Sequence, residues 1–369
     1  NMKLLTVEPL ENGRQGEDIL RSCKILRTDA KGRAEKEERL WFQFPAVEKY
    51  PDSDDCDSYL LAMFMEGMEE GRKIVVKGSV SGELLSNLVE LQSIWNKWVP
   101  ERYGLVDIEV DHIRESGVRV PGAVCAFSGG VDGSFTVWRH SQSKCSYRSQ
   151  KINFCSLVHG FDIPLADADA FENALKRAED TLEDIDLTIL PIRTNYREIT
   201  KKWTHKFSAA LTAALSNFKY LSGTCLIGSG KSYDELILSR GSSPITDHLL
   251  SSGEFVVIHD GASHNRVEKV AQIAEWQKGV SNLRVCFQAS QNGENCGKCE
   301  KCVRTKLNFL ACNQPVPDCF PESVSIKDQL QGAAIKKFLK KAAKKNDYVH
   351  TEWQQILDYA DRHKVKASW

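Results

Sequence analysis

The chain has 369 residues, of which 41% are hydrophobic and 27% are charged, with a formal net charge of −1. This length favours two or three domains, and the composition is typical of soluble globular proteins. The near-neutral charge argues against a nucleic-acid-binding protein, and no apolar run approaches the ~20 residues that cross a bilayer. The N-terminal residues lack the apolar segment of a signal peptide, so we expect a cytoplasmic protein without a membrane partner.

The first 118 residues predict an α+β module of their own (1–118). An aromatic strand at 40–44 ends at a proline, a helix follows, and a β-branched strand covers 73–80. Ser81 is placed to cap the next helix, whose leucines and tryptophans recur every three or four residues and should form a buried face. An alternating strand at 105–113 completes the module.

From residue 120 the chain alternates short buried strands with helices. The strands are expected at 123–127, 153–160, 187–192, 224–230 and 255–260. Short apolar strands separated by amphipathic helices are typical of an α/β fold whose parallel sheet is covered on both faces. Ligands of such sheets bind at the carboxyl ends of the strands. The sequence places four segments at those ends: 128–134, His159 with Gly160, Arg193, and 228–231.

The loop SGGVDGS, at residues 128–134, follows the first of these strands directly and opens a helix. Its glycines allow backbone N–H groups to approach a phosphate, and the positive end of the helix adds to the attraction. Ser128 and Ser134 supply hydroxyl donors, whereas Asp132 suits a loop that holds a divalent ion or caps its own backbone. The loop therefore predicts an anion site, with a plain glycine turn as the alternative.

A second glycine-rich run, GSGKS at 228–232, lacks the spacing of a phosphate-binding P-loop. We expect it to line the substrate pocket instead, with Lys231, Tyr233 and Asp234. The polar stretch 241–269 offers further candidates for substrate contact, although Asp and His in loops are usually only solvated. These candidates are Asp247, His259, Asp260 and Arg266.

Four of the twelve cysteines form the pattern C-x9-C-x2-C-x2-C: Cys286, Cys296, Cys299 and Cys302. Thiolates at this spacing can converge on one cation from a tight turn, which predicts a tetrahedral Zn²⁺ site. Four ligands leave no open position for water, so a structural zinc is favoured over a catalytic one, and a redox C-x2-C pair is the alternative. The other eight cysteines are scattered without a pairing pattern, as in reduced cytosolic proteins.

The segment AFSGGVDGSFTV at 126–137 resembles the pyrophosphate loop, SGGxDS, of the PP-loop ATP pyrophosphatases. Within that superfamily, the cysteine pattern is similar to the zinc motif of the 7-cyano-7-deazaguanine synthase (QueC) family. The resemblance covers about residues 119–312 and implies a Rossmann-like PP-loop domain of the adenine nucleotide α-hydrolase (HUP) type. The N-terminal module and a helical extension at 313–369 are additions to the short synthases.

The resemblance also implies roles for individual residues. It assigns binding of ATP to Ser128, Gly129, Gly130, Asp132, Gly133, Ser134 and His159. Asp132 and Lys269 are the expected catalytic residues, with Asp162 as a further candidate and Mg²⁺ as the ion that accompanies the nucleotide. A surface or core role is the alternative for His159, Asp162 and Lys269. In one departure from the family pattern, Gly133 replaces the serine after the aspartate, and Ser134 follows one step later. This departure affects which groups are expected to contact the phosphates, but it does not change the expectation that the loop binds ATP.

The function that the resemblance implies is that of an ATP-dependent ligase. The carboxylate of a 7-carboxy-7-deazaguanine-type substrate would be adenylated, and an amine would then displace AMP to give an amide or a nitrile. Family members with comparable additions belong to bacterial antiphage operons, where a deazaguanine is thought to be attached to a protein amine. A protein acceptor, a role in antiviral defence and a homodimer are therefore implied, while the sequence leaves the role of residues 1–118 open.

Two other functions remain as alternatives. A PP-loop tRNA-modifying enzyme would need a basic surface and a catalytic cysteine outside the zinc cluster. A non-catalytic adaptor would keep the fold and bind a partner through residues 1–118. Pyrophosphate release separates the adaptor from both enzymes, and dependence on tRNA separates the two enzymes. A basic amphipathic helix predicted at 335–345 would suit nucleic acid or an acidic partner, although a solvated helix is the commoner role of such a segment.

Overall fold

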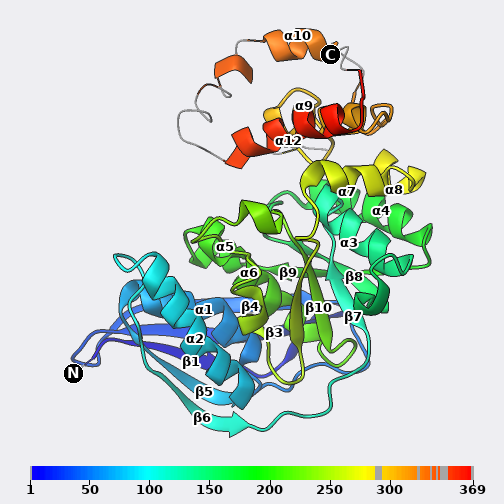
Figure 1. Cartoon of the computed structure of the whole chain (residues 1–369). Helices are drawn as coiled ribbons and strands as arrows, with labels where there is room; N and C mark the ends of the chain where they lie inside the picture. Colours follow the sequence, from blue (N-terminus) through cyan, green and yellow to red (C-terminus); the bar gives the residue numbers. More distant parts are fainter. Residues whose placement is uncertain are drawn as a thin grey trace.

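The computed structural model describes residues 2–286, 293–321, 325–332, 335–337, 340 and 348–366. Its strands join into one 11-stranded sheet with the order β11-β10-β7-β8-β9-β4-β3-β1-β5-β6, and β2 pairs beside β3 (Figure 1). The strands are β1 (Leu4–Pro9), β2 (Gly13–Gln15), β3 (Asp18–Thr28), β4 (Ala34–Phe44), β5 (Lys73–Ser81), β6 (Ile108–Arg114), β7 (Ala123–Ala126), β8 (Ile152–His159), β9 (Ile189–Thr194), β10 (Thr224–Gly228) and β11 (Val256–Asp260).

The half of the sheet from β11 to β9 is entirely parallel, because each neighbouring pair in it runs in the same direction. The predicted α/β class with a parallel sheet is therefore confirmed, and the arrangement is compatible with a Rossmann-like fold. The chain leaves β7 toward β8 and β9 on one side and later returns to β10 and β11 on the other. Ligands of such sheets bind where the strand order reverses, which here is the gap between the carboxyl ends of β7 and β10.

The N-terminal strands continue the same sheet instead of forming one of their own. Strand β4 pairs antiparallel with β9, with Phe42 opposite Thr194 and Gln43 opposite Arg193. The sequence predicts a separate α+β module, and the elements are α+β as expected, but they share hydrogen bonds with the parallel half. Where one domain ends and the next begins remains a prediction.

Helices cover both faces of this sheet. Helices α1, α2 and α6 enclose one hydrophobic core, and α3 and α4 enclose a second core on the opposite face (Figure 1). Val124 belongs to the first core and its neighbours Ala123 and Cys125 to the second, as alternating strand side chains require. The helices are α1 (Asp57–Glu70), α2 (Gly82–Trp98), α3 (Val131–Ser141), α4 (Ala168–Glu183), α5 (Tyr196–Ile199), α6 (Trp203–Leu215), α7 (Arg266–Ile273), α8 (Gln277–Ser281), α9 (Glu300–Ala311), α10 (Ile326–Gln331) and α12 (Tyr348–Arg362).

Local predictions in the N-terminal part are largely confirmed. The Ser81 hydroxyl accepts from the N–H of Leu84 and caps α2, and Trp95 is buried in the first core. The strand predicted at 40–44 is longer, because β4 begins at Ala34. Its first five residues, AEKEE, are largely exposed and charged, so they carry no apolar signal, and pairing with β3 makes them a strand.

A buried group of charges connects the N-terminal part to the rest of the molecule. The Nζ of Lys219 lies 2.5 Å from Asp55 and 2.9 Å from Glu254, and Arg114 lies 2.6 Å from Asp57. The three carboxylates are close enough together to hold a metal ion. The Lys219 ammonium already lies among them, so we assign the group to holding the two parts together.

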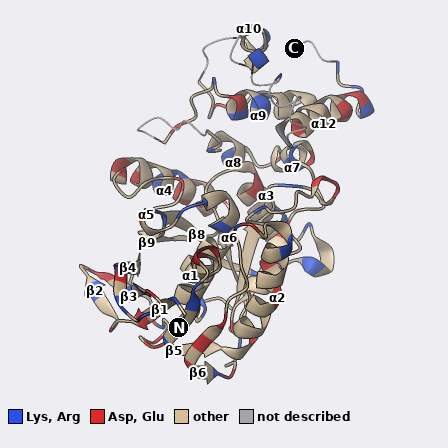
Figure 2. Ribbon diagram, turned by 90° about the vertical axis from the view of Figure 1, so that its left-hand side faces the viewer, with Lys and Arg blue, Asp and Glu red and all other residues tan. Residues whose placement is uncertain are grey.

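The described part of the C-terminal region packs through helices. Helix α12 contacts α9 and α7, and these three helices share a small hydrophobic core. The predicted lysine-rich helix at 335–345 lies mostly outside the described residues, which include only 335–337 and 340 of it. None of the helices in the described ranges is both long and apolar enough to span a membrane. Basic and acidic segments are interspersed along the ribbon (Figure 2).

Candidate functional site

The predicted anion loop lies between the end of β7 and the start of α3. Gly129 adopts a φ of +79°, a left-handed conformation that favours glycine, and Gly130 is the N-cap of α3 without a side-chain cap. The first backbone N–H groups of an α-helix have no partner within the helix. The loop therefore leaves donors at the positive end of an 11-residue helix, at the point where the strand order reverses.

Asp132 forms the centre of a charged group on the first turn of α3. The Nζ of Lys269 lies 3.0 Å from its Oδ1, and Nη1 of Arg266 lies 3.6 Å from its Oδ2. Burial raises the pKa of Asp132, but the charges of Lys269 and Arg266 outweigh this and lower it to about 2. Lys269 is 1% exposed and also donates to the carbonyl of Ser229. The structure thus brings together the two residues predicted to be catalytic.

Gly133 and Ser134 occupy the tightly packed side of the same turn. A Cβ added at Gly133 would lie 3.3 Å from the carbonyl oxygen of Ala126, so a larger residue there would press α3 against the end of β7. The hydroxyl of Ser134 is buried and has no hydrogen-bond partner among the described residues. Buried hydroxyls are normally paired, so the unpaired hydroxyl of Ser134 can still donate a hydrogen bond to a ligand of the loop.

Further cations surround the loop. Arg284 donates through Nε to the carbonyl of Ser128 at 3.1 Å, and its backbone N–H donates to Gly129 at 2.8 Å. Burial and the nearby charge of Arg266 lower the pKa of Lys301 to about 8, with Asp132 acting in the opposite direction. Depressed lysine pKa values are expected where several cations gather around few carboxylates.

Lys231 extends this cationic group from the loop that follows β10. It is 6% exposed, and burial, assisted by Arg240 and Arg304, lowers its pKa to about 7, with Glu235 acting against them. Its Nζ lies 2.5 Å from Oε1 of Glu352. The nearby carboxylate of Glu352 favours the charged ammonium, so the ion pair opposes the effect of burial.

Glu352 comes from α12, far along the chain. It is 7% exposed, and Arg304 pairs with its other carboxylate oxygen. The described C-terminal helix therefore places an acidic side chain against two cations of the site. This contact could not be expected from the sequence, because α12 has an ordinary amphipathic pattern.

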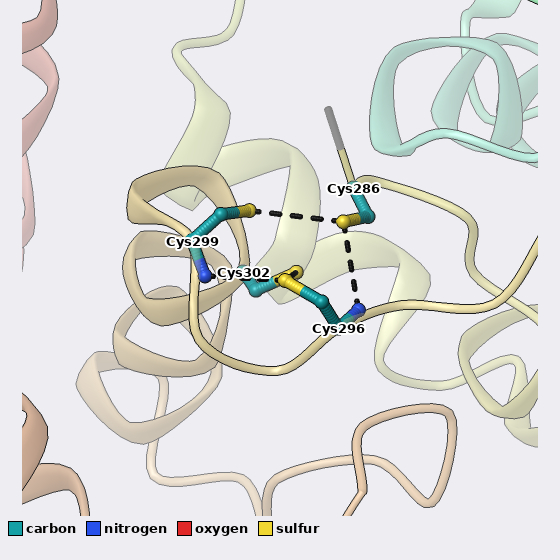
Figure 3. A group of neighbouring side chains, drawn as sticks. All are labelled: Cys286, Cys296, Cys299 and Cys302. Carbon is teal, nitrogen blue, oxygen red and sulfur yellow. Dashed lines mark hydrogen bonds between the residues drawn. The ribbon is translucent and has the colours of Figure 1, made fainter. Parts of the chain in front are cut away.

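The four predicted cysteines converge, with their sulfur atoms turned toward one another (Figure 3). The Sγ atoms of Cys286 and Cys299 are 3.8 Å apart, and those of Cys296 and Cys302 are 3.9 Å apart. A tetrahedron with Zn–S bonds of about 2.3 Å has S···S edges of about 3.8 Å. The donor set and spacing therefore fit Zn²⁺, and the four thiols could hold such a metal.

The cysteine cluster is built into the start of α9. Cys299 is the N-cap of this helix, and Cys302 lies in its first turn. Lys301 and Arg304 belong to the same first turns, so a metal held by the cysteines would also fix the direction from which these two cations approach the loop.

Two predicted residues lie apart from this group. His159 is 2% exposed, stacks on Phe171 with ring centroids 4.3 Å apart, and its Nε2 lies 2.9 Å from the carbonyl oxygen of Pro164. Burial lowers its pKa, so a neutral packed ring is the better description. Asp162 is exposed, and its charge raises the pKa of Arg284 and of Lys301 against the larger, opposite effect of burial.

The other candidates at the end of β11 divide between its two faces. Asp260 accepts from Thr136 at 2.8 Å and pairs with Arg139 at 2.5 Å, so it holds α3 against the sheet. His259 lies on the opposite face and pairs with Asp247 at 2.7 Å. Asp260 is thus a structural residue, whereas the pair of His259 and Asp247 forms no hydrogen bond or ion pair with α3 among the described residues.

No protein-family model, curated protein or solved structure matches this chain. The family assignment therefore remains a proposal that depends on the motifs themselves.

Sequence reasoning missed several residues of the site: Arg284, Lys301, Arg304 and Glu352. Arg284 and Arg304 flank the cysteine motif and Lys301 lies within it, and that proximity is the only signal in the sequence that could have pointed to them. Glu352 had no such signal.

Proposed function

We propose that this protein is an ATP-dependent carboxylate–amine ligase of the PP-loop type. The observation that carries the proposal is the glycine loop at the N-terminus of α3, surrounded by cations from α7, from Arg284, from α9 and from the loop after β10. Unpaired backbone donors and a concentration of positive charge are what a polyphosphate requires. The sequence pattern SGGVDGS adds the specific resemblance to the ATP pyrophosphatases.

In this proposal the loop and its cations hold the β- and γ-phosphates of ATP while the α-phosphate is attacked. The N–H groups of α3 and the hydroxyls of Ser128 and Ser134 would donate to the departing pyrophosphate, and Lys269 and Arg266 would balance its charge. Both Asp132 oxygens face cations, so we assign Asp132 to orienting Lys269 and not to metal binding. Mg²⁺, when bound with the nucleotide, supplies further neutralisation of phosphate charge.

The substrate class follows from the cysteine cluster together with the loop. Their joint similarity to the 7-cyano-7-deazaguanine synthases supports a carboxylate of the 7-carboxy-7-deazaguanine type, joined to ammonia or to a protein amine with release of AMP and pyrophosphate. We assign the Cys286 cluster a structural zinc that fixes the first turn of α9, because four thiolates leave no position for a reacting water. A protein acceptor would be consistent with a role in antiviral defence.

The test is to incubate the zinc-loaded protein with Mg²⁺, ATP and 7-carboxy-7-deazaguanine, with and without ammonium, and to follow AMP, pyrophosphate and the mass of the base. We expect AMP formation that depends on the deazaguanine. The variant Lys269→Met should lose it, whereas Lys278→Met, which removes a half-exposed lysine paired with Asp180, should not. AMP formation with tRNA alone would support the tRNA-modifying alternative, and no pyrophosphate release with any acceptor would support an adaptor.

A further inference from the structure

His259, at the carboxyl end of β11, forms a hydrogen-bonded pair with Asp247 of the segment between β10 and β11. The Nδ1 of His259 lies 2.7 Å from Oδ2 of Asp247. Asp247 is fully buried and also accepts from the Ser242 hydroxyl at 2.6 Å, the Ser208 hydroxyl at 2.9 Å and the backbone N–H of Ser243 at 3.2 Å. Donors on both oxygens hold this carboxylate in one orientation, and it in turn orients the imidazole ring.

The pair leaves the other ring nitrogen unused. The side chain of His259 is 6% exposed, and its Nε2 is buried without a hydrogen-bond partner among the described residues. Because Asp247 accepts at Nδ1, the proton of a neutral ring lies on Nδ1, and Nε2 carries a free lone pair. An unpaired buried polar atom is costly, and His159 also carries one, at its Nδ1. His259 differs from His159 because a buried carboxylate fixes its other ring nitrogen.

Strand pairing and backbone hydrogen bonds link the segment around His259 to the loop at 128–134. It pairs in register with Ile227 of β10, and a Cβ added at the next residue, Gly228, would lie 2.8 Å from the carbonyl oxygen of Asp132. Ser229 donates its N–H to the carbonyl of Asp260, and its own carbonyl accepts from Lys269. The histidine thus stands on the β10 side of the gap where the strand order reverses, facing away from α3.

We infer that His259 is the general base of the amide-forming step, with Asp247 as its positioning residue. This inference rests on the proposed ligase function. The nitrogen of the amine attacks the acyl carbon of the adenylated carboxylate, and the bond from that carbon to the phosphate oxygen of AMP breaks. AMP leaves as an anion, and one proton passes from the attacking nitrogen to Nε2 of His259, which then releases it to water. An aspartate that holds one nitrogen while the other takes a proton is a recurring arrangement for such bases.

The test compares two nucleophiles in the full-length protein. Ammonium must lose one proton before it can attack and a second as the amide forms, and both pass in turn to Nε2 of His259 and from there to water. Hydroxylamine is largely unprotonated at neutral pH and traps acyl-adenylates as hydroxamates with the loss of a single proton. For His259→Gln we expect amide formation from ammonium to fall by about 100-fold or more, the usual range for loss of a general base, and hydroxamate formation to fall far less. Asp247→Asn should shift the same ratio in the same direction by a smaller factor.

The controls separate this inference from misfolding and from failure of the proposed function. Rates are normalised to ATP–pyrophosphate exchange, which measures the fraction of protein that still adenylates its substrate. His248→Gln changes the exposed histidine beside Asp247 and should leave the ratio unchanged. Equal losses with both nucleophiles, or no loss, would overturn the role of His259. Absence of exchange in the wild-type protein would instead overturn the proposed function, and this inference with it.

Discussion

The buried charges around Lys219 allow a quantitative test of how the N-terminal part is attached. Lys219 is 1% exposed and lies between Asp55 of the N-terminal part and Glu254 of the C-terminal part. The variant Lys219→Met keeps a side chain of similar length but removes the charge. Arg114 would then be the cation paired with the buried carboxylates, and its Nη2 lies 2.6 Å from Asp57 and 3.3 Å from Asp55. Arg21 adds a further attraction for Asp55.

The magnitude follows from that imbalance. Breaking a buried ion pair by removing one partner typically costs about 3–5 kcal/mol, and partial compensation by Arg114 places the expected loss near the lower end, about 3 kcal/mol. For a chain of 369 residues that unfolds as one unit, the entropy of unfolding is about 0.8 kcal/mol per K. We therefore expect Lys219→Met to lower Tm by about 4 °C at pH 7.

The dependence on pH has a definite sign. Burial lowers the pKa of Lys219, but Asp55 and Asp57 raise it above its usual value overall. A raised lysine pKa stabilises the fold below the unfolded value and loses this effect only as the pH rises through the folded value, so at pH 7 the contribution is fully present. In the variant the carboxylates repel one another, and the difference from wild type should shrink as they protonate toward about pH 4.

Thermal unfolding followed by circular dichroism and by limited proteolysis would measure both effects. Lys97→Met, which removes an exposed lysine of α2, is the matched control and should leave Tm within about 1 °C. One cooperative transition that moves down is the expected result. A Tm equal to that of the control, or a variant whose penalty grows at low pH, would refute the reasoning.

Three further predictions concern the site. Asp132→Asn should reduce ATP-dependent pyrophosphate release by about 100-fold or more, since Lys269 loses the carboxylate that orients it. The activity of the wild-type protein should show no titration of Asp132 above about pH 4, because the pKa of that group is about 2. Cys302→Ser should lose bound zinc by metal analysis, whereas Cys145→Ser, outside the cluster, should retain it; equal zinc contents would contradict the assignment. Glu352→Gln should lower the KM for ATP by a few-fold, since it removes the negative charge paired with Lys231 and Arg304. Asp358→Asn, on the exposed side of α12, should leave the KM unchanged, and an unchanged KM in Glu352→Gln would contradict the prediction.

Much of the parallel half of the fold could be predicted from the sequence. Short apolar runs separated by amphipathic helices mark β7 to β11, because a strand buried on both faces must be apolar along its length. The loop at 128–134 and the four cysteines could also be recognised from the sequence, since glycine content, spacing and donor type are local properties. These features needed no knowledge of which segments meet.

The pairing of distant segments could not be predicted in the same way. The contact of β4 with β9 depends on backbone hydrogen bonds, which any sequence can form, and the charged start of β4 gives no apolar pattern to follow. Lys269 was a candidate from the sequence, but only the fold brings it to Asp132. The pair of His259 and Asp247 was present in the sequence as two separate polar residues.

The sequence by itself determined a glycine-rich loop that follows a strand, four soft ligands that could hold a metal, and a parallel sheet to position them. Only the tertiary structure decided which charges surround the loop, that a carboxylate from α12 reaches them, and that the N-terminal strands extend the same sheet. The physical reason is the separation along the chain over which each kind of interaction acts. Helix, strand and turn preferences act over a few neighbouring residues, whereas ion pairs and sheet edges join residues a hundred or more positions apart.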